Sequence, residues 1–395
     1  AGVIDITSPS LPLCPGNITP VVVVENKGTD TLNNVQVFWD VNGVIDSTLF
    51  TGTINPGTTA NVSLGTVTIL ASTTYNIKFY TKNPNGLADM LVSDDTLSLL
   101  NLSTGLVGNF TINSGQLTGG TNFASFTDFA TAVSTLGVCG NIDVDVVANS
   151  GPYNEQFLLQ NIVGTSASSR ITINGNNDTL SFVTSSNERR IVGLSNVSFI
   201  TLKNLNIVSA GPTFGYGIQM DMGSHDILID SCNIDISAVT STSSVNSVGI
   251  LSSGSLTSPA TTGNNASRIT ISNSRINGGI SEGMYYGIRF NGLSTTISDT
   301  SIRIVNNEIS NFYAYGIYLN HISNSLIEGN DIHRADKQTV TTFYGIYTTG
   351  GSSADTANAN RIHNSHGSAT SLTGASYPIY NSSNDADPTN PNIFV

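Results

Sequence analysis

The stretch from residue 304 to residue 346 repeats two short motifs, and this repetition decides the fold. It contains Ile304-Val305-Asn306-Asn307-Glu308-Ile309, then Tyr315-Gly316-Ile317, then Ile327-Glu328-Gly329-Asn330-Asp331-Ile332, and then Tyr344-Gly345-Ile346. The first motif has an apolar residue, a small or amide residue three positions later, and a final Ile. The second is a Gly-Ile pair, usually preceded by Tyr. Short β-branched runs separated by Asn and Gly are typical of strands and tight turns.

Both motifs recur upstream and downstream at intervals of roughly 30 residues, which is a repeat-protein period. The first motif ends at Ile207, Ile234, Ile276, Ile309, Ile332 and Ile362, and the second has its glycine at Gly217, Gly249, Gly287, Gly316 and Gly345. A single coil of this length cannot bury its apolar side chains alone, so successive coils must stack. The pattern predicts a right-handed parallel β-helix of about eight coils over residues 104–395, with Asn side chains bonding between equivalent bends.

The first 103 residues lack the repeat and consist of short expected strands between turn signals. Turn residues of the kinds Asn-Gly and Pro-Gly separate them, and the only Trp, Trp39, lies in an alternating run. This spacing predicts an immunoglobulin-like β-sandwich. The expected strands are 21–25, 34–41, 59–64, 74–81 and 96–100.

One amphipathic helix is expected at about 125–137, directly before the repeat. Apolar residues at 126, 129, 130, 133 and 136 share one helical face, Ser125 can cap its beginning, and Gly137 can end it. Its position predicts a lid over one end of the β-helix core. The expected architecture is therefore all-β, with a sandwich, a short capping helix and a β-helix.

Composition and charge exclude several classes of partner. The chain has 395 residues, only 10% of them charged, and a formal net charge of −13, which repels nucleic acid. No run of about 18 apolar residues is present, so we expect no membrane span. Three cysteines, Cys14, Cys139 and Cys232, allow at most one disulfide and form no C-x-x-C zinc motif.

Two parts of the chain resemble secreted and cell-surface proteins of the Bacteroidetes, of the type IX secretion class. Residues 13–16, 26–32, 39–43 and 74–77 are similar to CARDB-like Ig-fold modules, which act as spacers or adhesive units. Residues 123–129, 137–140, 151–156 and 169–173 resemble the opening segment of β-helix proteins in that class. The resemblance implies a secreted or cell-surface location. Because no type IX sorting domain follows Val395, we expect the chain to be part of a longer polypeptide.

Catalysis was considered because β-helices often degrade polysaccharides. Glu308 and Asp331 occupy the same outward position one coil apart and, with His333, form the best candidate catalytic set for a lyase or glycoside hydrolase. They could equally form a Ca²⁺ site, or belong to a solvated face on which Arg275 and Arg361 balance the acids. Other than this possible Ca²⁺ we expect no cofactor; the oxygen-rich segment 384–390 fits a linker better than a Ca²⁺ loop.

A row of tyrosines is the candidate binding face. The residues one position after each repeat Ile should point outward, and they are Gln219, Leu251, Arg289, Tyr318, Tyr347 and Tyr380. The last three would form an aromatic ladder, which suits stacking on sugars or contact with proteins. The alternative is that these rings only stabilise the sheet.

Two functions follow as expectations. The first is a non-catalytic extracellular protein, an adhesin or a structural segment of a cell-surface fibre, whose partners are glycans, proteins or further copies of itself. The second is a secreted polysaccharide lyase or glycoside hydrolase. No complete catalytic constellation supports the second, and the scant charge and the modular organisation favour the first.

Overall fold

The computed structural model describes residues 1–293, 299–370, 374–382 and 391–395, and these are almost entirely β-structure. The expected linker 384–390 lies outside the described residues. The chain divides into two compact units: residues 1–107 with 136–139, and residues 108–135 with 140–395.

The first unit consists of short antiparallel sheets with the orders β1-β3-β6, β5-β4-β8-β9 and β2-β7. Strand β4 alternates as the sequence predicts: Val35, Val37, Trp39 and Val41 are buried in one apolar core. All five expected strands are present. The elements are β1 (Gly2–Ser8), β2 (Gly16–Ile18), β3 (Val21–Glu25), β4 (Leu32–Val41), β5 (Val44–Ile54), β6 (Thr59–Ser63), β7 (Val67–Ile69), β8 (Thr74–Lys82), η1 (Pro84–Gly86), η2 (Val92–Asp94) and β9 (Thr96–Ser103).

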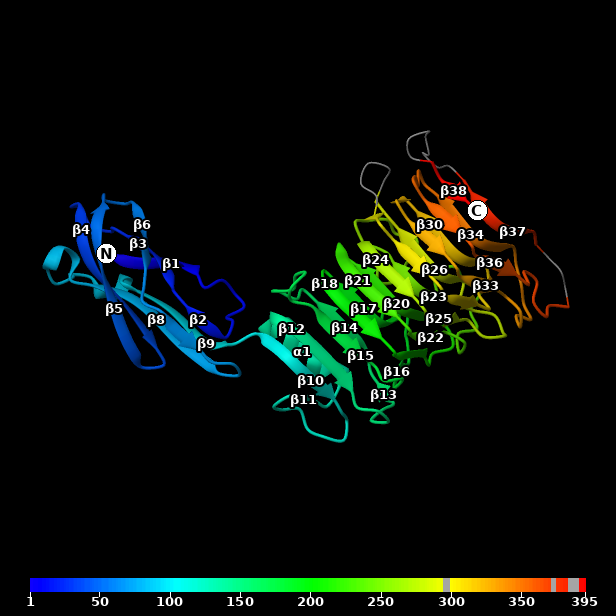
Figure 1. Cartoon of the computed structure of the whole chain (residues 1–395), viewed down its shortest axis with the longest axis horizontal. Helices are drawn as coiled ribbons and strands as arrows, with labels where there is room; N and C mark the ends of the chain where they lie inside the picture. Colours follow the sequence, from blue (N-terminus) through cyan, green and yellow to red (C-terminus); the bar gives the residue numbers. More distant parts are fainter. Residues whose placement is uncertain (294–298, 371–373, 383–390) are drawn as a thin grey trace. The chain divides into compact units, whose positions relative to one another are not determined.

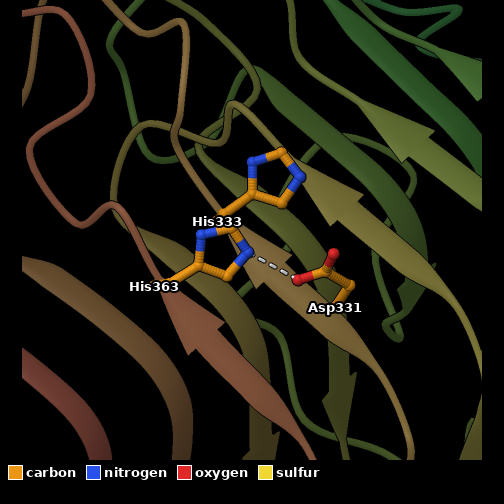
Figure 2. A group of neighbouring side chains, drawn as sticks. All are labelled: Asp331, His333 and His363. Carbon is orange, nitrogen blue, oxygen red and sulfur yellow. Dashed lines mark hydrogen bonds and ion pairs between the residues drawn. The ribbon is translucent and has the colours of Figure 1, made fainter.

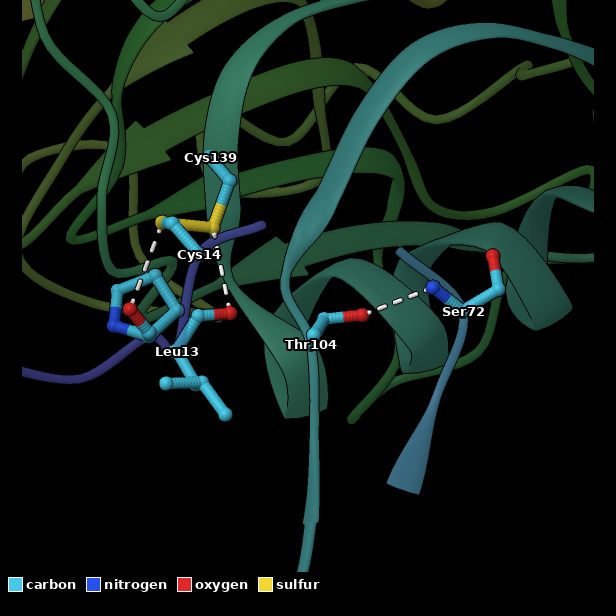
Figure 3. The surroundings of a disulfide bond; sticks show 6 residues. Leu13, Cys14, Ser72, Thr104 and Cys139 are labelled. Atoms are coloured by element: carbon cyan, nitrogen blue, oxygen red, sulfur yellow. Dashed lines mark hydrogen bonds between the residues drawn. A yellow bond between two sulfur atoms is a disulfide. The ribbon is translucent and has the colours of Figure 1, made fainter. Parts of the chain in front are cut away.

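One disulfide, Cys14–Cys139, closes this unit across 125 positions of sequence, and Figure 3 shows its surroundings. Beside it, the backbone N–H of Ser72 donates to Oγ1 of Thr104 at 3.0 Å. The third cysteine, Cys232, is a free, buried thiol. The expectation of at most one bridge is confirmed.

The second unit is a stack of coils that form three long sheets, visible in Figure 1 as parallel rows of arrows from green to red. Each coil contributes one strand to each sheet, and equivalent strands of neighbouring coils pair in parallel. Crossovers between parallel strands are almost always right-handed, and the arrangement matches a right-handed parallel β-helix. The predicted β-helix is thus confirmed, with three strands in a coil where the sequence required at least two.

The three sheets are named here by number, and all their strands are short. Sheet I has the order β11 (Asn122–Phe123), β10 (Leu106–Ile112), β12 (Val138–Val146), β15 (Ile171–Asn174), β18 (Ser198–Lys203), β21 (Ser224–Asp230), β24 (Ala266–Ser272), β28 (Arg303–Val305), β32 (Leu326–Glu328), β35 (Thr356–Asn358) and β38 (Ile393–Phe394). Sheet II has the order β13 (Tyr153–Asn154), β16 (Thr179–Phe182), β19 (Asn206–Ser209), β22 (Asn233–Asp235), β25 (Arg275–Asn277), β29 (Glu308–Ser310), β33 (Asp331–His333) and β36 (Arg361–His363). Sheet III has the order β14 (Phe157–Gln160), β17 (Arg190–Ser195), β20 (Gly215–Asp221), β23 (Ser247–Ser252), β26 (Tyr286–Asn291), β30 (Tyr315–Asn320), β34 (Phe343–Thr349) and β37 (Ser376–Asn381). Strands β27 (Asp299–Thr300) and β31 (Ile322–Ser323) form a separate pair.

The repeat isoleucines form columns inside the coils. Ile276, Ile309 and Ile332 pair in register along sheet II, and Ile288, Ile317 and Ile346 do so along sheet III. All six are fully buried. Because side chains alternate across a strand, the residues on either side of each sheet II isoleucine project away from the core.

The single α-helix of the described residues, α1 (Phe126–Leu136), has the bounds that the sequence predicts and lies against the first coil. Oγ of Ser125 accepts from the N–H of Asp128 at 3.0 Å, as expected of an N-cap. The ring of Phe126 packs on Tyr153 and Phe157, so the helix covers apolar side chains of that coil. Within the described residues, no helix has the length and apolar character needed to span a membrane.

Candidate functional site

The outer face of sheet II carries the predicted acid and histidine residues. Ile332 points into the core, so Asp331 and His333 on β33 both project outward. Register then places Glu308 beside Asp331, and His363 of β36 beside His333. Glu308, Asp331 and His333 thus lie on one outer face, where the repeat register predicts them.

His363, which the sequence argument missed, completes the group. Its Nε2 lies 2.7 Å from Oδ1 of Asp331, and its ring stacks on that of His333 with centroids 4.9 Å apart (Figure 2). Nε2 of His333 lies 3.8 Å from Oε1 of Glu308. Counting one position past each repeat Ile of sheet II would have found both histidines, because that count gives His333 after Ile332 and His363 after Ile362.

Arginines flank both carboxylates. Arg275 lies 3.5 Å from Glu308, and Arg361 lies 3.3 Å from Asp331, so the two neighbouring acids of this column stand between two arginines. This arrangement agrees with the alternative of a solvated face on which Arg275 and Arg361 balance the acids. Partial burial lowers the pKa of His333, although the carboxylates of Asp331 and Glu308 act in the opposite direction.

Three charged residues that are close in sequence to this group are not part of the outer face of sheet II. Arg303 and Glu328 belong to β28 and β32 of sheet I, not to sheet II. Arg334 is fully buried and donates to the carbonyl oxygens of Tyr313 and Ser365, so its guanidinium holds loops together. The polar cluster on sheet II therefore consists of Glu308, Asp331, His333 and His363, with Arg275 and Arg361 beside the two acids.

Sheet III carries two parallel columns of tyrosine, which we call the tyrosine face. The first column comes from the residue two positions before each repeat Ile, and the second from the residue directly after it. The first column is Tyr286, Tyr315, Tyr344 and Tyr377, and the second is Tyr318, Tyr347 and Tyr380.

Rings stack closely along each column. Tyr318 and Tyr347 have centroids 5.0 Å apart with planes 7° apart, and Tyr347 and Tyr380 are 5.2 Å apart at 10°. The first column is similar, at 4.7 Å and 7° for Tyr315 and Tyr344. Between the columns the rings are nearly perpendicular, at 86° for Tyr315 and Tyr318. Part of each flat face is thus covered by the next ring, and the surface offers mainly ring edges and hydroxyl groups.

The predicted outward row is accessible only in its C-terminal half, where Tyr318 and Tyr347 are half-buried and Tyr380 is exposed. Tyr380 is 36% exposed, but Gln219 and Leu251 are fully buried and Arg289 is 5% exposed. These three side chains stand in the same outward row as Tyr318, as predicted, but other groups cover them, so they are not exposed. Nε2 of Gln219 donates to the carbonyl of Ser255 in the loop after β23, and the guanidinium of Arg289 lies over the rings of Tyr286 and Tyr318 at 4.5 and 4.4 Å.

The first tyrosine column was not recognised from the sequence as a surface feature. Its residues belong to the Tyr-Gly-Ile motif, which was interpreted as part of the inward pattern. Burial raises the pKa of Tyr286 to about 12, while Tyr377 at the other end of the column is 37% exposed. The recurrence of Tyr before Gly in successive repeats was the available signal.

A groove of about 740 Å³ beside α1 offers a different kind of surface. Its one acidic lining residue, Glu155, accepts hydrogen bonds from the N–H groups of Phe126 and Thr127 at the beginning of the helix. Because this carboxylate caps the beginning of α1, we assign Glu155 a structural role.

Comparisons with known proteins identify no family. No family model matches the chain, and no curated protein matches it. Similar solved structures include pectate lyase Pel9A, with 10% identity and a TM-score of 0.37 over 67% of this chain and 78% of that one. An alginate lyase from Paenibacillus sp. str. FPU-7 has 13% identity and a TM-score of 0.35 over 68% and 99% of the two chains. PfbA, a surface adhesin of Streptococcus pneumoniae, has 13% identity and a TM-score of 0.34 over 64% and 70%.

Proposed function

We propose that this chain is a non-catalytic extracellular surface protein, an adhesin or a structural segment of a cell-surface fibre, that contacts glycans through the tyrosine face. The first unit would serve as a CARDB-like, Ig-fold spacer of the Bacteroidetes surface-protein type, and the β-helix as a stiff scaffold. The observation that carries the proposal is the double column of stacked tyrosines on sheet III.

The chemistry of this face supports contact with a repetitive, neutral polymer. Tyr combines an apolar body with a hydroxyl group that both donates and accepts hydrogen bonds. Coils repeat about every 4.8 Å, so the face offers a periodic row of such groups. The stacking already fixes the rings, so little side-chain entropy remains to be lost on binding.

The state of the carboxylates supports a non-catalytic function. Glu308 and Asp331 are each paired with an arginine, and Glu155 caps α1. A catalytic acid or base must be free to contact the substrate, and these three carboxylates are already engaged by arginines or by backbone N–H groups.

The proposal is tested by measuring the binding of the wild type and of three variants to a panel of glycans. Tyr318→Ala/Tyr347→Ala should weaken binding by about tenfold or more, because the contacts of the ring edges and of the hydroxyl groups are both removed. Tyr318→Phe/Tyr347→Phe keeps the ring stack, so a loss there would assign the contact to the hydroxyls. Tyr80→Ala is the matched control, since Tyr80 also stacks on an aromatic ring, Phe38, but lies in the first unit. Unchanged binding in the alanine double variant, with its fold intact by circular dichroism, would refute the tyrosine face as the contact surface.

A second candidate is a secreted polysaccharide lyase or glycoside hydrolase. The observation that favours it is the convergence of Glu308, Asp331 and His333 on one outer face, which offers two carboxylates and an imidazole. Release of reducing ends from neutral and acidic polysaccharides, with and without Ca²⁺, distinguishes the two candidates. Sustained turnover that Asp331→Asn abolishes in a folded protein would replace the non-catalytic proposal.

A further inference from the structure

The group on sheet II has the composition of a transition-metal site. One ligand atom each from Asp331, His333 and His363 can be chosen so that all three lie within 4.8 Å of one another. Two donors come from β33 and the third from β36, the equivalent strand one coil later. Parallel register fixes this proximity, since each histidine directly follows the repeat Ile of its strand, Ile332 or Ile362.

We propose that Asp331, His333 and His363 bind one divalent transition metal of the Zn²⁺ class on the outside of sheet II. Two imidazoles and one carboxylate are borderline donors that suit Zn²⁺, whereas Ca²⁺ takes oxygen ligands almost exclusively. This assignment replaces the Ca²⁺ site that the acidic pair Glu308 and Asp331 alone would indicate.

Binding requires at least one of the two stacked imidazole rings to rotate, because a ligating nitrogen directs its lone pair in the plane of its ring and these planes are only 21° apart. Donor atoms about 2.0–2.1 Å from a tetrahedral zinc ion lie about 3.3 Å from each other. The Nε2 atom of His363 and Oδ1 of Asp331 are 2.7 Å apart, so zinc would take the place of the proton that they share. Three protein donors leave the fourth position for water.

Access and charge also suit an ion that arrives from solvent. The side chains of Asp331, His363 and His333 are 38%, 25% and 13% exposed. Arg361, at 73% exposure, is the cation that zinc would compete with, and its side chain is free to move into water. Glu308, 3.8 Å from His333, adds negative charge beside the site. Bound metal would join two coils, so it should also stabilise the stack.

Isothermal titration of the full chain with ZnCl₂ at pH 7.5, after treatment with a chelator, is the test. We expect one zinc ion per chain. His333→Ala and His363→Ala should each weaken zinc binding by roughly 10- to 100-fold or more. Loss of a residue that only hydrogen-bonds to a metal ligand already costs that much affinity, and these two residues are proposed to bind the metal directly. Zinc should raise the unfolding temperature of the wild type but not of these variants.

His225→Ala is the matched control, because His225 also contacts a carboxylate, Asp226 at 2.7 Å, but has no second imidazole in its group. It should leave zinc binding unchanged. Zinc binding that survives in His333→Ala/His363→Ala would overturn the proposal. So would saturable binding of CaCl₂ that Asp331→Asn removes and the histidine variants do not, because that result assigns an oxygen site. The tyrosine face lies on another sheet, so glycan binding by the histidine variants reports separately on the proposed function.

Discussion

At the scale of single residues, the glycine of the Tyr-Gly-Ile motif is explained by close approach of neighbouring coils. A Cβ atom on Gly316 would lie 2.6 Å from the carbonyl oxygen of Gly345 and 2.7 Å from Cγ2 of Ile332. Gly287 is similar, with 2.6 Å to the carbonyl oxygen of Gly316. No other residue fits without displacing backbone, so the recurrence of Gly is a packing requirement and carries no information about ligands.

A buried carboxyl, Asp299, is a second residue-scale feature. It is 1% exposed and accepts hydrogen bonds from the N–H groups of Asn265 at 3.3 Å and Ala266 at 3.1 Å. Burial raises its pKa from the ordinary value of 3.8 to about 7, against the opposing effect of these hydrogen bonds. Near neutral pH the group therefore changes between a protonated and an ionised form inside the protein.

Asp299 should make stability fall as the pH rises. Between pH 4 and 7 the folded chain holds a proton that the unfolded chain has released, so this contribution is present at low pH and is lost as the pH rises through 7. Relative to Asp299→Asn, the wild type should lose on the order of 2 kcal/mol of unfolding free energy between pH 5 and pH 7.5. Urea unfolding of both proteins at each pH measures the difference, and the comparison cancels all other titrating groups. A difference that does not change with pH would contradict the assignment.

At the scale of the strand and its bends, a ladder of asparagines joins the coils between sheets I and II. Oδ1 of Asn330 accepts from the backbone N–H and from Nδ2 of Asn307, both at 3.0 Å. Oδ1 of Asn360 does the same for Asn330, at 3.0 and 2.9 Å. Each Nδ2 also donates to a backbone carbonyl, such as that of Ile304 for Asn330. The predicted bonding between Asn residues at equivalent bends is confirmed.

Replacing one member should break the ladder on both sides. Asn330→Ala leaves the backbone N–H of Asn307 without its acceptor and the carbonyl of Ile304 without its side-chain donor, and Nδ2 of Asn307 keeps only its bond to the carbonyl of Ile271. We expect a loss of about 3 kcal/mol, because each buried unsatisfied polar group costs about 1–3 kcal/mol. Chemical unfolding followed by far-ultraviolet circular dichroism measures it. Asn264→Ala, in an exposed loop position before β24, should change stability by less than about 0.5 kcal/mol; similar losses in both variants would argue against the ladder.

At the scale of the whole molecule, the two units carry different spectroscopic and covalent markers. Trp39, the only Trp in the sequence, is 3% exposed in the core of the first unit. The disulfide Cys14–Cys139 also belongs to that unit, whereas the free thiol of Cys232 is buried in the second, where burial raises its pKa to about 11. Unfolding of the first unit can therefore be followed by tryptophan fluorescence alone.

Removing the disulfide should destabilise the first unit selectively. Cys14→Ser/Cys139→Ser frees a segment of 125 positions in the unfolded chain, and we expect the fluorescence-detected unfolding free energy to fall by about 2–4 kcal/mol. The circular dichroism transition of the β-helix should move much less. Thiol titration provides the check on the pairing: denatured, unreduced wild type should have one reactive thiol, and three would show that the bridge is absent.

The sequence by itself determined the coil. Columns such as Ile309–Ile332, the bends with Asn307 and Asn330, and the helix from Phe126 to Leu136 all follow from local periodicity. Their physical basis is short-range: strand alternation separates inward from outward side chains, and an apolar stripe with a cap and a terminal Gly specifies a helix. The grouping of Glu308, Asp331 and His333 also followed from the repeat register.

Only the tertiary structure decided which outward side chains are exposed and which groups meet across coils. Gln219 and Arg289 occupy outward positions but are covered by a loop and by aromatic rings, and Arg334 is turned inward to bind carbonyl oxygens. His363 reaches back one coil to Asp331. The periodicity of apolar residues in the sequence predicts whether a side chain points into the core or away from it. What lies above it depends on loops of irregular length and on side-chain rotation, which no local pattern encodes.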